Sequence, residues 1–464
     1  MQTELRQFYV TLFSLALPII VQNVITSSLH LVDTAMIGQI GEIEVAAVGL
    51  ANRYVFILIL VFFAISNGTS ILTAQYWGKK TTESIGVMMA IAVLPCLGLS
   101  LLFFAGALFF PEAILAVFTK DAFVIETGSL YLRPVAWSYI FTAVTMLYAL
   151  VLRSMEAVKL PMYAAIIALS LNTLLNYCLI LGHFGFPALE VRGAAIATLI
   201  ARIVEAVIIL TGCYWKKYPV VSFSDFLRIN STLIRQFFKT AFPVLVNELS
   251  WVLGMTMYTV VFARMGTAEI AAMNIVGPVE GLSVGAFLGM ANAGATMIGN
   301  QIGAGRDGRA SRYAARFSVL SPLGAVGMGL VIAFCAPTIV SYFKVSREVR
   351  EMALNTLFVL SAVLWVKMFN LMCIVGILRA GGDTTFSMLL EMIVIWLVGV
   401  PLAFLGGLYW KMPVHWVFAL VCVEEVLKML AGMMRMMSKK WIHDLTNMLP
   451  VPLPEEQERI PASW

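Results

Sequence analysis

Long apolar stretches recur along the whole chain, and few folds can accommodate them. We count about twelve, each of roughly 20 to 30 residues, and a helix of about 20 apolar residues already crosses a bilayer's hydrocarbon core. Hydrophobic residues make up 60% of the chain and charged residues only 12%, which is outside the range of soluble domains. We therefore predict an all-α polytopic membrane protein with about twelve transmembrane helices. Their expected centres are Ile25, Leu60, Leu97, Thr142, Ser170, Val204, Gly254, Phe287, Met328, Leu364, Leu397 and Val423.

The two halves of the chain repeat each other at an offset of about 225 residues. A duplicated six-helix unit inserts twice with the same orientation, so the sequence predicts two six-helix lobes related by a pseudo-two-fold axis along the membrane normal. Two such lobes can expose a central cleft to either side of the membrane in turn. The paired landmarks are Leu17-Pro18 with Phe242-Pro243, Gly41 with Gly266, Ala46-Ala47 with Ala271-Ala272, Gln75-Tyr-Trp-Gly78 with Asn300-Gln-Ile-Gly303, and Leu152-Arg153 with Leu378-Arg379.

Basic residues between the apolar stretches predict the orientation. The basic residues expected on the side of the termini outnumber those expected on the other side. Because basic loops stay in the cytoplasm, we expect a multi-pass protein of the cell (inner) membrane with both termini in the cytoplasm. The charges are therefore topology signals and not a nucleic-acid surface. The expected units are an N-lobe of residues 1–214, a cytoplasmic linker of residues 215–239, a C-lobe of residues 240–440 and a cytoplasmic tail of residues 441–464.

Asp33 lies inside the first apolar stretch, where a carboxylate costs at least about 2.5 kcal/mol. Asn23, Thr26, His30 and Asp33 are spaced 3, 4 and 3 residues apart, which places them on one helix face. Intramembrane acids usually face a bundle interior and mark an ion or proton path. The alternative is a buried, hydrogen-bonded kink or cap without such a role.

The sequence carries no sign of catalysis. Its six cysteines lie in or beside apolar stretches without a CxxC or Cys/His pattern, its four histidines are far apart, and it has no GxxxxGK[ST] motif for ATP. We expect a transporter and not an enzyme, with no cofactor apart from a coupling ion, Na⁺ or H⁺, and with no metal other than Na⁺.

Taken together, the landmarks resemble the multidrug and toxic compound extrusion (MATE) family of efflux antiporters. The resemblance implies a V-shaped pair of six-helix lobes that exports small organic cations across the lipid bilayer, driven by sodium or proton entry, in a protein that acts as a monomer. The residues that carry it are Leu17-Pro18, Val32-Asp33-Thr-Ala-Met-Ile-Gly38, Gln75-Tyr-Trp-Gly78, Leu152-Arg153, Gly193-Ala-Ala-Ile-Ala-Thr198, Ile298-Gly-Asn-Gln-Ile-Gly303 and Leu378-Arg379-Ala-Gly-Gly-Asp383-Thr384.

By this resemblance, the N-lobe cation site consists of Asp33, Asn172, Asn176 and Thr198. One carboxylate with neutral oxygens suits Na⁺ and can equally hold a proton. Some relatives have an aspartate where Asn176 stands, which would favour sodium more strongly; the alternative for the two asparagines is hydrogen bonding between helices alone. Pro18 occupies the place of a first-helix proline at which some family members bend, although a static kink is an equal reading.

The second half repeats the polar stripe as Glu248, Trp251, Met255 and Tyr258. Glu248 resembles the seventh-helix carboxylate of the NorM-type branch, whose tenth-helix aspartate has no counterpart here. We expect Glu248 and Glu280, with Trp251, Met255 and Tyr258, to line a C-lobe cavity that attracts cationic compounds. Because an unpaired charge is costly, at least one acidic residue should pair with Lys367 or Lys428. Arg153 and Arg379 are expected to be structural.

These expectations favour a secondary active multidrug efflux antiporter that exports cationic or amphipathic organic compounds in exchange for Na⁺ or H⁺ by alternating access. A lipid-linked oligosaccharide flippase of the same superfamily is the alternative, and it would need several Arg or Lys in its cleft to hold an anionic pyrophosphate. A membrane scaffold or receptor would leave the charged interior unexplained.

Overall fold

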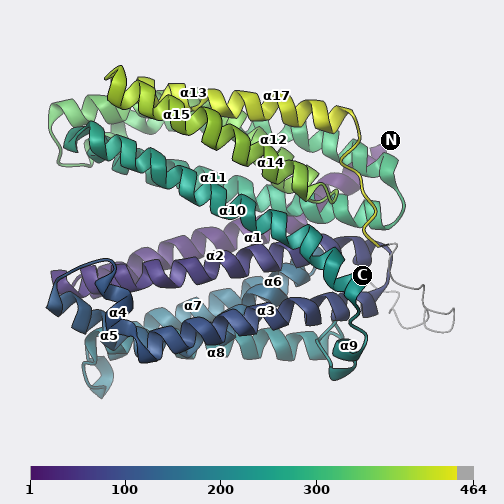
Figure 1. Ribbon diagram of the computed structural model, residues 1–464, viewed down its shortest axis with the longest axis horizontal. Helices are drawn as coiled ribbons and strands as arrows, with labels where there is room; N and C mark the ends of the chain where they lie inside the picture. The colour runs from purple at the N-terminus through teal and green to yellow at the C-terminus, as the bar shows by residue number, and fades with distance from the viewer. Residues whose placement is uncertain (1, 447–464) are drawn as a thin grey trace.

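The computed structural model describes residues 2–446, except for the side chains of residues 2, 3 and 27–31. Long helices lie side by side in two bundles, and the bundles diverge at the end of the molecule away from the chain termini (Figure 1). The N-terminal helices are α1 (Gln2–Ile37), α2 (Glu42–Gly78), α3 (Thr82–Phe109), α4 (Pro111–Ala116), α5 (Ala122–Ala136), α6 (Ser138–Ser154), α7 (Lys159–Leu179), α8 (Glu190–Trp215) and α9 (Phe223–Leu227). The C-terminal helices are α10 (Ser231–Met265), α11 (Thr267–Gly303), α12 (Asp307–Ser341), α13 (Arg347–Leu371), α14 (Thr384–Val394), α15 (Val400–Phe404), α16 (Val414–Val421) and α17 (Val423–Met437).

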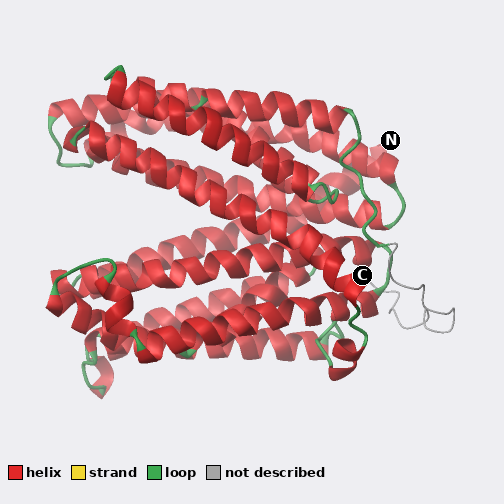
Figure 2. Cartoon of the chain, in the orientation of Figure 1, coloured by secondary structure: helices red, strands yellow, loops and turns green. Residues whose placement is uncertain are grey.

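The prediction of an all-α membrane protein is confirmed. Within residues 2–446 the chain is helix and short loops (Figure 2), and pairing of the strand type is limited to an isolated bridge between Gly382 and Ile442. Among residues 2–446, ten helices are long and apolar enough to cross a membrane, and there are eleven if α5 and α6, which meet at a bend of 54°, form one span. Pro134 lies one turn before that bend and removes a backbone donor from α5, which accounts for it.

The last predicted span, centred on Val423, is also helical but differs from the others. It consists of α16 and α17, which are separated at Cys422. Both helices are short, and α17 contains Glu424, Glu425, Lys428 and Arg435. Length and composition alone therefore do not mark it as a span, although its position matches the repeat.

Each bundle has its own core. In the N-terminal bundle Phe62, Met88 and Tyr139 are fully buried, and in the C-terminal bundle Val261, Leu360 and Leu364 are. The predicted linker of residues 215–239 is partly helical, because it contains α9 and the first turns of α10. The unit boundaries at residues 214, 239 and 440 stay predictions.

The first helix of each half packs against the other half. α1 contacts α11, and α10 contacts α2 in the equivalent way. Phe8, Leu12 and Ile19 of α1 share a buried core with Phe317 of α12 and with Trp441. Further along, α1 returns to its own bundle and contacts α7. A single continuous helix therefore links the interior of one lobe to the opposite lobe.

The segment that follows α17 packs against both bundles. Residues 438–446, which we call the C-terminal strap, lie across the end of both bundles where the termini are (Figure 1). Gln75 of α2 donates to the carbonyl of His443 (3.1 Å) and accepts from the Leu445 amide (2.8 Å), while Lys79 donates to the carbonyl of Thr446 (3.2 Å). Trp441 is 1% exposed. The predicted tail thus begins inside the fold, and its residues 447–464 lie outside the described part of the chain.

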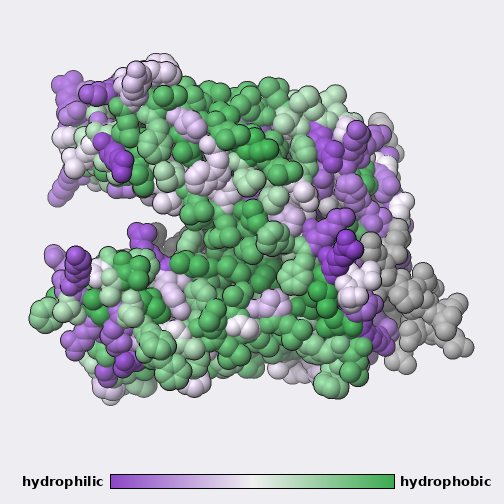
Figure 3. Space-filling model, viewed as in Figure 1, coloured by the Kyte–Doolittle hydropathy of each residue, from purple (hydrophilic) through white to green (hydrophobic). Residues whose placement is uncertain are grey.

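The surface view shows where the molecule is open. An apolar belt covers the middle of the molecule, hydrophilic residues gather at both ends, and a cleft between the bundles opens at the end away from the termini (Figure 3). This shape fits a protein that spans a bilayer with its cleft accessible from one side.

Candidate functional site

Four polar side chains meet inside the N-terminal bundle, and they are the four that the resemblance selects. Asn176 of α7 donates to Asp33 of α1 at 2.8 Å. Asn172 lies one turn before Asn176 and within 3.3 Å of its amide nitrogen, and Thr198 of α8 is 3.5 Å from Asn172. Three helices thus contribute to one cluster, which we call the N-lobe cluster: Asp33, Asn172, Asn176 and Thr198.

The Asn172 amide links the carboxylate to α8. In the orientation that satisfies both of its ends, its nitrogen donates to the second carboxylate oxygen of Asp33 (3.1 Å) and its oxygen accepts from the Thr198 backbone amide (3.2 Å). Asp33 therefore receives one hydrogen bond from each asparagine. This arrangement stabilises the carboxylate and holds α1 against α7.

One oxygen of the cluster lacks a donor. The side-chain oxygen of Asn176 is buried and receives no hydrogen bond from any described residue, and Asn176 is 2% exposed. Buried carbonyl oxygens normally have a partner. A carboxylate beside an unsatisfied amide oxygen is the donor set that a hard cation such as Na⁺ uses, and the carboxylate alone could hold a proton. The residues present therefore fit a monovalent cation, and their role as its site stays a prediction.

The polar stripe on α1 does not act as one unit. Asn23 donates to the carbonyl of Gly285 in α11 at 3.2 Å, so it contacts the other bundle, whereas Asp33 contacts α7. The side chain of His30 lies outside the described residues. Pro18 lies within α1, which continues unbroken from Gln2 to Ile37. A bend at Pro18 stays a prediction.

In the C-terminal bundle, both acidic residues that we expect to attract cationic compounds form ion pairs with basic side chains of the protein. Glu248 pairs with Arg379 at 2.7 Å, and Glu280 pairs with Lys367. The prediction that at least one acid pairs with Lys367 or Lys428 is confirmed. Arg379 also donates to Asn247, so it fixes α10 to the segment that follows α13.

A second buried charge cluster lies on α17. Lys428 contacts Glu424 at 3.2 Å and Glu425 at 3.5 Å, and Glu425 accepts from Asn370. Tyr258 of α10 donates its hydroxyl to Glu424 at 2.5 Å. Tyr258 is thus buried in the core, whereas Trp251 and Met255 are exposed. The spacing of Glu424 and Glu425 from Lys428, four and three residues, is the sequence signal that could have identified this cluster.

Comparisons with known proteins agree with the geometry. A family model described as MatE matches residues 18–178 and 243–405, so its two matches start at the offset of the internal repeat. The "Uncharacterized transporter YisQ" of Bacillus subtilis (strain 168) is 25% identical over 438 residues, covering 93% of this chain and 95% of that protein. The "Probable multidrug resistance protein NorM" of Thermotoga maritima is 23% identical, with coverages of 93% and 92%.

Solved structures share the fold. The outward-facing conformation of a multidrug resistance MATE family transporter of the MOP superfamily superposes with a TM-score of 0.82 and 19% identity, covering 93% of this chain and 96% of that one. A crystal structure of MATE in the bent conformation superposes with a TM-score of 0.83 at the same identity and coverage. Since the family model covers most of the chain, in both halves, this protein belongs to the MatE family and is a membrane transporter, not an enzyme.

Proposed function

We propose that this protein is a multidrug efflux antiporter, which exports cationic and amphipathic organic compounds in exchange for Na⁺ or H⁺. The observation that carries the proposal is the N-lobe cluster, where the carboxylate of Asp33 on α1 lies beside the unsatisfied amide oxygen of Asn176 on α7, and α1 also packs against the other lobe. The relatives named as multidrug resistance proteins support the class of cargo.

Coupling follows from the position of Asp33. Binding of Na⁺ or H⁺ changes the charge at the contact between α1 and α7, and α1 continues into the contact with α11. An ion shifts a conformational equilibrium only by its differential affinity for the two states. The cluster supplies that difference if the outward-open and inward-open states hold α1 differently against α7.

The orientation rests on loop charge. The connections that follow α2, α8 and α11 carry Lys79, Lys80, Lys216, Lys217 and Arg306, whereas those at the opposite end have fewer basic residues. Basic loops stay in the cytoplasm. We therefore place the protein in the cell (inner) membrane, with both termini in the cytoplasm and the cleft open to the opposite side. Since one chain contains both lobes, it acts as a monomer.

Lipid-linked sugar flipping is not favoured. A flippase for an anionic pyrophosphate needs several uncompensated cations in its cleft, and here Arg379, Lys367 and Lys428 each pair with a carboxylate. The comparisons point to relatives named for multidrug resistance.

The test is efflux of a fluorescent organic cation from proteoliposomes under an imposed Na⁺ gradient or an imposed proton gradient. We expect one gradient to drive efflux and Asp33→Asn to abolish it. The matched control is Asp121→Asn, because Asp121 is an exposed N-cap at which asparagine serves equally well. If neither gradient drives movement, the drug-export proposal fails; if Asp33→Asn keeps coupled efflux, the N-lobe assignment fails.

A further inference from the structure

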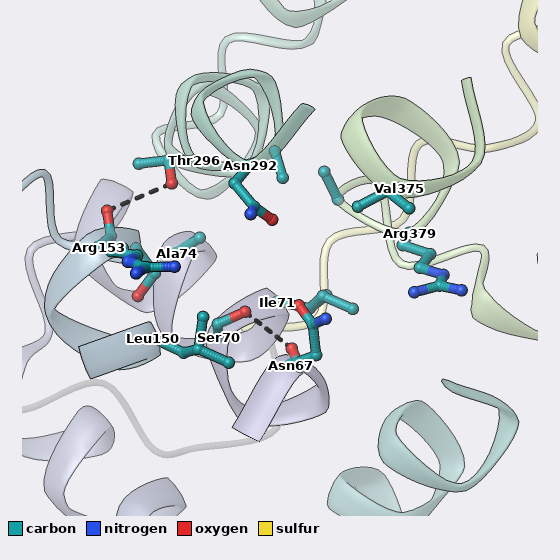
Figure 4. Close-up of a pocket in the computed structure, with 13 residues that line it drawn as sticks. Asn67, Ser70, Ile71, Ala74, Leu150, Arg153, Asn292, Thr296, Val375 and Arg379 are labelled. Carbon is teal, nitrogen blue, oxygen red and sulfur yellow. Dashed lines mark hydrogen bonds between the residues drawn. The ribbon is translucent and has the colours of Figure 1, made fainter. Parts of the chain in front are cut away.

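A small cavity lies on the boundary between the two lobes. Arg153 of α6 and Arg379 of the segment after α13 lie on opposite sides of it (Figure 4). Both arginines already make contacts, since Arg153 donates to Gln22 at 2.8 Å and Arg379 forms the ion pair described above. Ala380 also lines the cavity, and its carbonyl accepts from the side-chain nitrogen of Gln75, near the end of α2, at 3.2 Å. Gln75 therefore bridges the lobes beside the cavity, toward the end where the termini lie.

The same Gln75 side chain also binds the C-terminal strap. Its nitrogen donates to the carbonyl of His443 at 3.1 Å, and its oxygen accepts from the Leu445 amide at 2.8 Å. Lys79, one turn further along α2, donates to the carbonyl of Thr446 at 3.2 Å. The Leu445 side chain packs against the core of the N-terminal bundle. The second half of the strap is therefore bound to the N-lobe.

The first half of the strap is fixed to the C-lobe. The indole of Trp441 is buried in a core that includes residues of α11, α12 and α13. The backbone amide of His443 donates to the carbonyl of Gly381 at 2.8 Å, and Gly382 pairs with Ile442 in the isolated bridge. A methyl group on Gly381 would overlap the Trp441 ring, so the indole packs directly against the backbone of the C-lobe.

The strap therefore limits how far the lobes can separate at this end. Trp441 and Leu445 are four residues apart, and four residues of extended chain span at most about 14 Å. Alternating access requires this end to open in part of the cycle. The contacts with α2 are the weaker ones, because water can replace three hydrogen bonds at little net cost, whereas exposing an indole is costly. The end of the strap at Leu445 is therefore the one that can detach.

The internal repeat does not account for the strap. Asn300 is the repeat equivalent of Gln75 and donates across the same boundary to Glu156, in the loop between α6 and α7, at 2.8 Å. That contact joins the lobes without an added segment. The residues of the first half that correspond to the strap, 212–220, pack on their own bundle, where Cys213 and Tyr218 contribute to the core. Within residues 2–446, the strap is thus an addition of the second half to a duplicated unit.

We propose that the C-terminal strap is a latch that holds the two lobes together at the end where the termini lie, and that its contacts with α2 break whenever this end opens. The latch stays on the C-lobe through Trp441 and releases Gln75 and Lys79. It favours the conformation in which the cleft is open at the opposite end, as in this structure. The proposal rests on the alternating access of the proposed function, and it concerns neither the cargo nor the coupling ion.

Distances between spin labels on the full-length protein in lipid nanodiscs test the latch. Labels at Lys80 and Arg306 report the opening of this end, and labels at His443 and Lys217 report whether the strap leaves the N-lobe, because all four side chains are exposed. Cys335 is replaced by serine, since the other five cysteines are buried. Pulsed electron resonance then gives the ratio of open to closed molecules for each variant.

We expect Gln75→Met to raise the ratio of open to closed molecules by about tenfold, and Lys79→Met, which removes a contact with the strap alone, to raise it by a few-fold. As the open fraction grows, the strap label should move away from Lys217 but keep its distance to Arg306, because the strap moves with the C-lobe. Gln39→Met is the matched control, since Gln39 is an exposed glutamine in the loop between α1 and α2, at the opposite end.

Two outcomes would overturn the latch. One is an unchanged ratio of open to closed molecules in both Gln75→Met and Lys79→Met, whatever happens to their unfolding temperature, because the strap would then only stabilise the fold. The other is a strap label that stays near Lys217 when the end opens. Spin-label distances need neither cargo nor a gradient, so failure of the latch leaves ion-driven efflux intact. Loss of coupling in Asp33→Asn likewise leaves the effect of Lys79→Met unchanged, so the two proposals fail separately.

Discussion

Gly78 at the end of α2 packs directly against the backbone of Asn300 in α11. The repeat-related contact is also present, since Gly303 of α11 packs against the backbone of Gln75 in α2. A methyl group on either glycine would overlap a carbonyl oxygen of the opposite helix. These paired contacts close the lobes at the end where the termini lie, next to the cavity between Arg153 and Arg379.

Gly303→Ala should therefore open this end. Because backbone atoms cannot move aside as a flexible side chain can, α2 and α11 must separate. The conformation in which the end near the termini is closed then loses population to the one in which that end is open. Spin labels at Lys80 and Arg306, both exposed, should show a longer distance by pulsed electron resonance. Gly277→Ala in the same helix is the control, because nothing lies within 4 Å of its added methyl group. An unchanged distance between the two labels would contradict the prediction that the added methyl group forces α2 and α11 apart.

The sequence predicted part of this contact. The repeat aligns Gly78 with Gly303 and Gln75 with Asn300, and it predicts an axis between equivalent helices. It does not say which helices meet at that axis, because local periodicity carries no information on the distance between lobes. Likewise the sequence places Trp441 in a tail, because a short stretch after the last helix shows no sign of its tertiary partners.

The ion pair between Glu248 and Arg379 predicts a stability effect. Arg379 is 4% exposed, so Glu248→Gln leaves a buried guanidinium without its counter-charge, which costs about 3–5 kcal/mol. We expect Glu248→Gln to lower the thermal unfolding temperature in detergent, and Glu248→Gln combined with Arg379→Met to recover much of the loss. If Glu248 served only to attract cargo, the single variant would unfold like the wild type and lose cation binding alone.

For the acidic residues, sequence reasoning could name the candidates but not their partners. Several acids and two lysines lie in the second half, and many pairings satisfy the requirement that buried charges be compensated. Helix packing decides the pairing of Glu280 in α11 with Lys367 in α13, whereas Glu424 and Lys428 are one turn apart in α17, so their pairing follows from spacing alone. The N-lobe cluster was easier to predict, because Asn172 and Asn176 share a helix face and the resemblance adds Asp33 and Thr198.

A substitution at Gly399 tests how tightly the buried charge cluster on α17 packs. A methyl group there would overlap both Glu424 and the Tyr258 hydroxyl, so Gly399→Ala must break their hydrogen bond or separate the helices. We expect a loss of about 1–3 kcal/mol, similar to other overpacked cores. Tyr258→Phe removes only the hydroxyl and should cost less, about 1 kcal/mol. Thermal unfolding of both variants measures the difference, and equal stability of Gly399→Ala and the wild type would contradict the packing.

A substitution at Trp441 tests whether the C-terminal strap stabilises the fold. Its indole is buried between Gly381 and the core shared with α1, and its ring nitrogen donates to the carbonyl of Met436 at 3.1 Å. Trp441→Ala should destabilise the protein by about 3–5 kcal/mol. Trp410→Ala is the matched control, since Trp410 is 53% exposed. A similar small effect of both substitutions would show that the strap does not stabilise the fold.

Asn176→Asp tests whether the N-lobe cluster binds the coupling ion. The substitution adds a second carboxylate beside Asp33 at the position of the unsatisfied amide oxygen, so it increases the negative charge that a cation meets. We expect sodium to bind to the purified protein about tenfold more tightly, measured by calorimetry in choline buffer at neutral pH. Below neutral pH the gain should shrink, because two close carboxylates share a proton. Asn230→Asp, at an N-cap where aspartate serves as well as asparagine, should change nothing. Unchanged sodium affinity in Asn176→Asp would place the coupling ion outside this cluster.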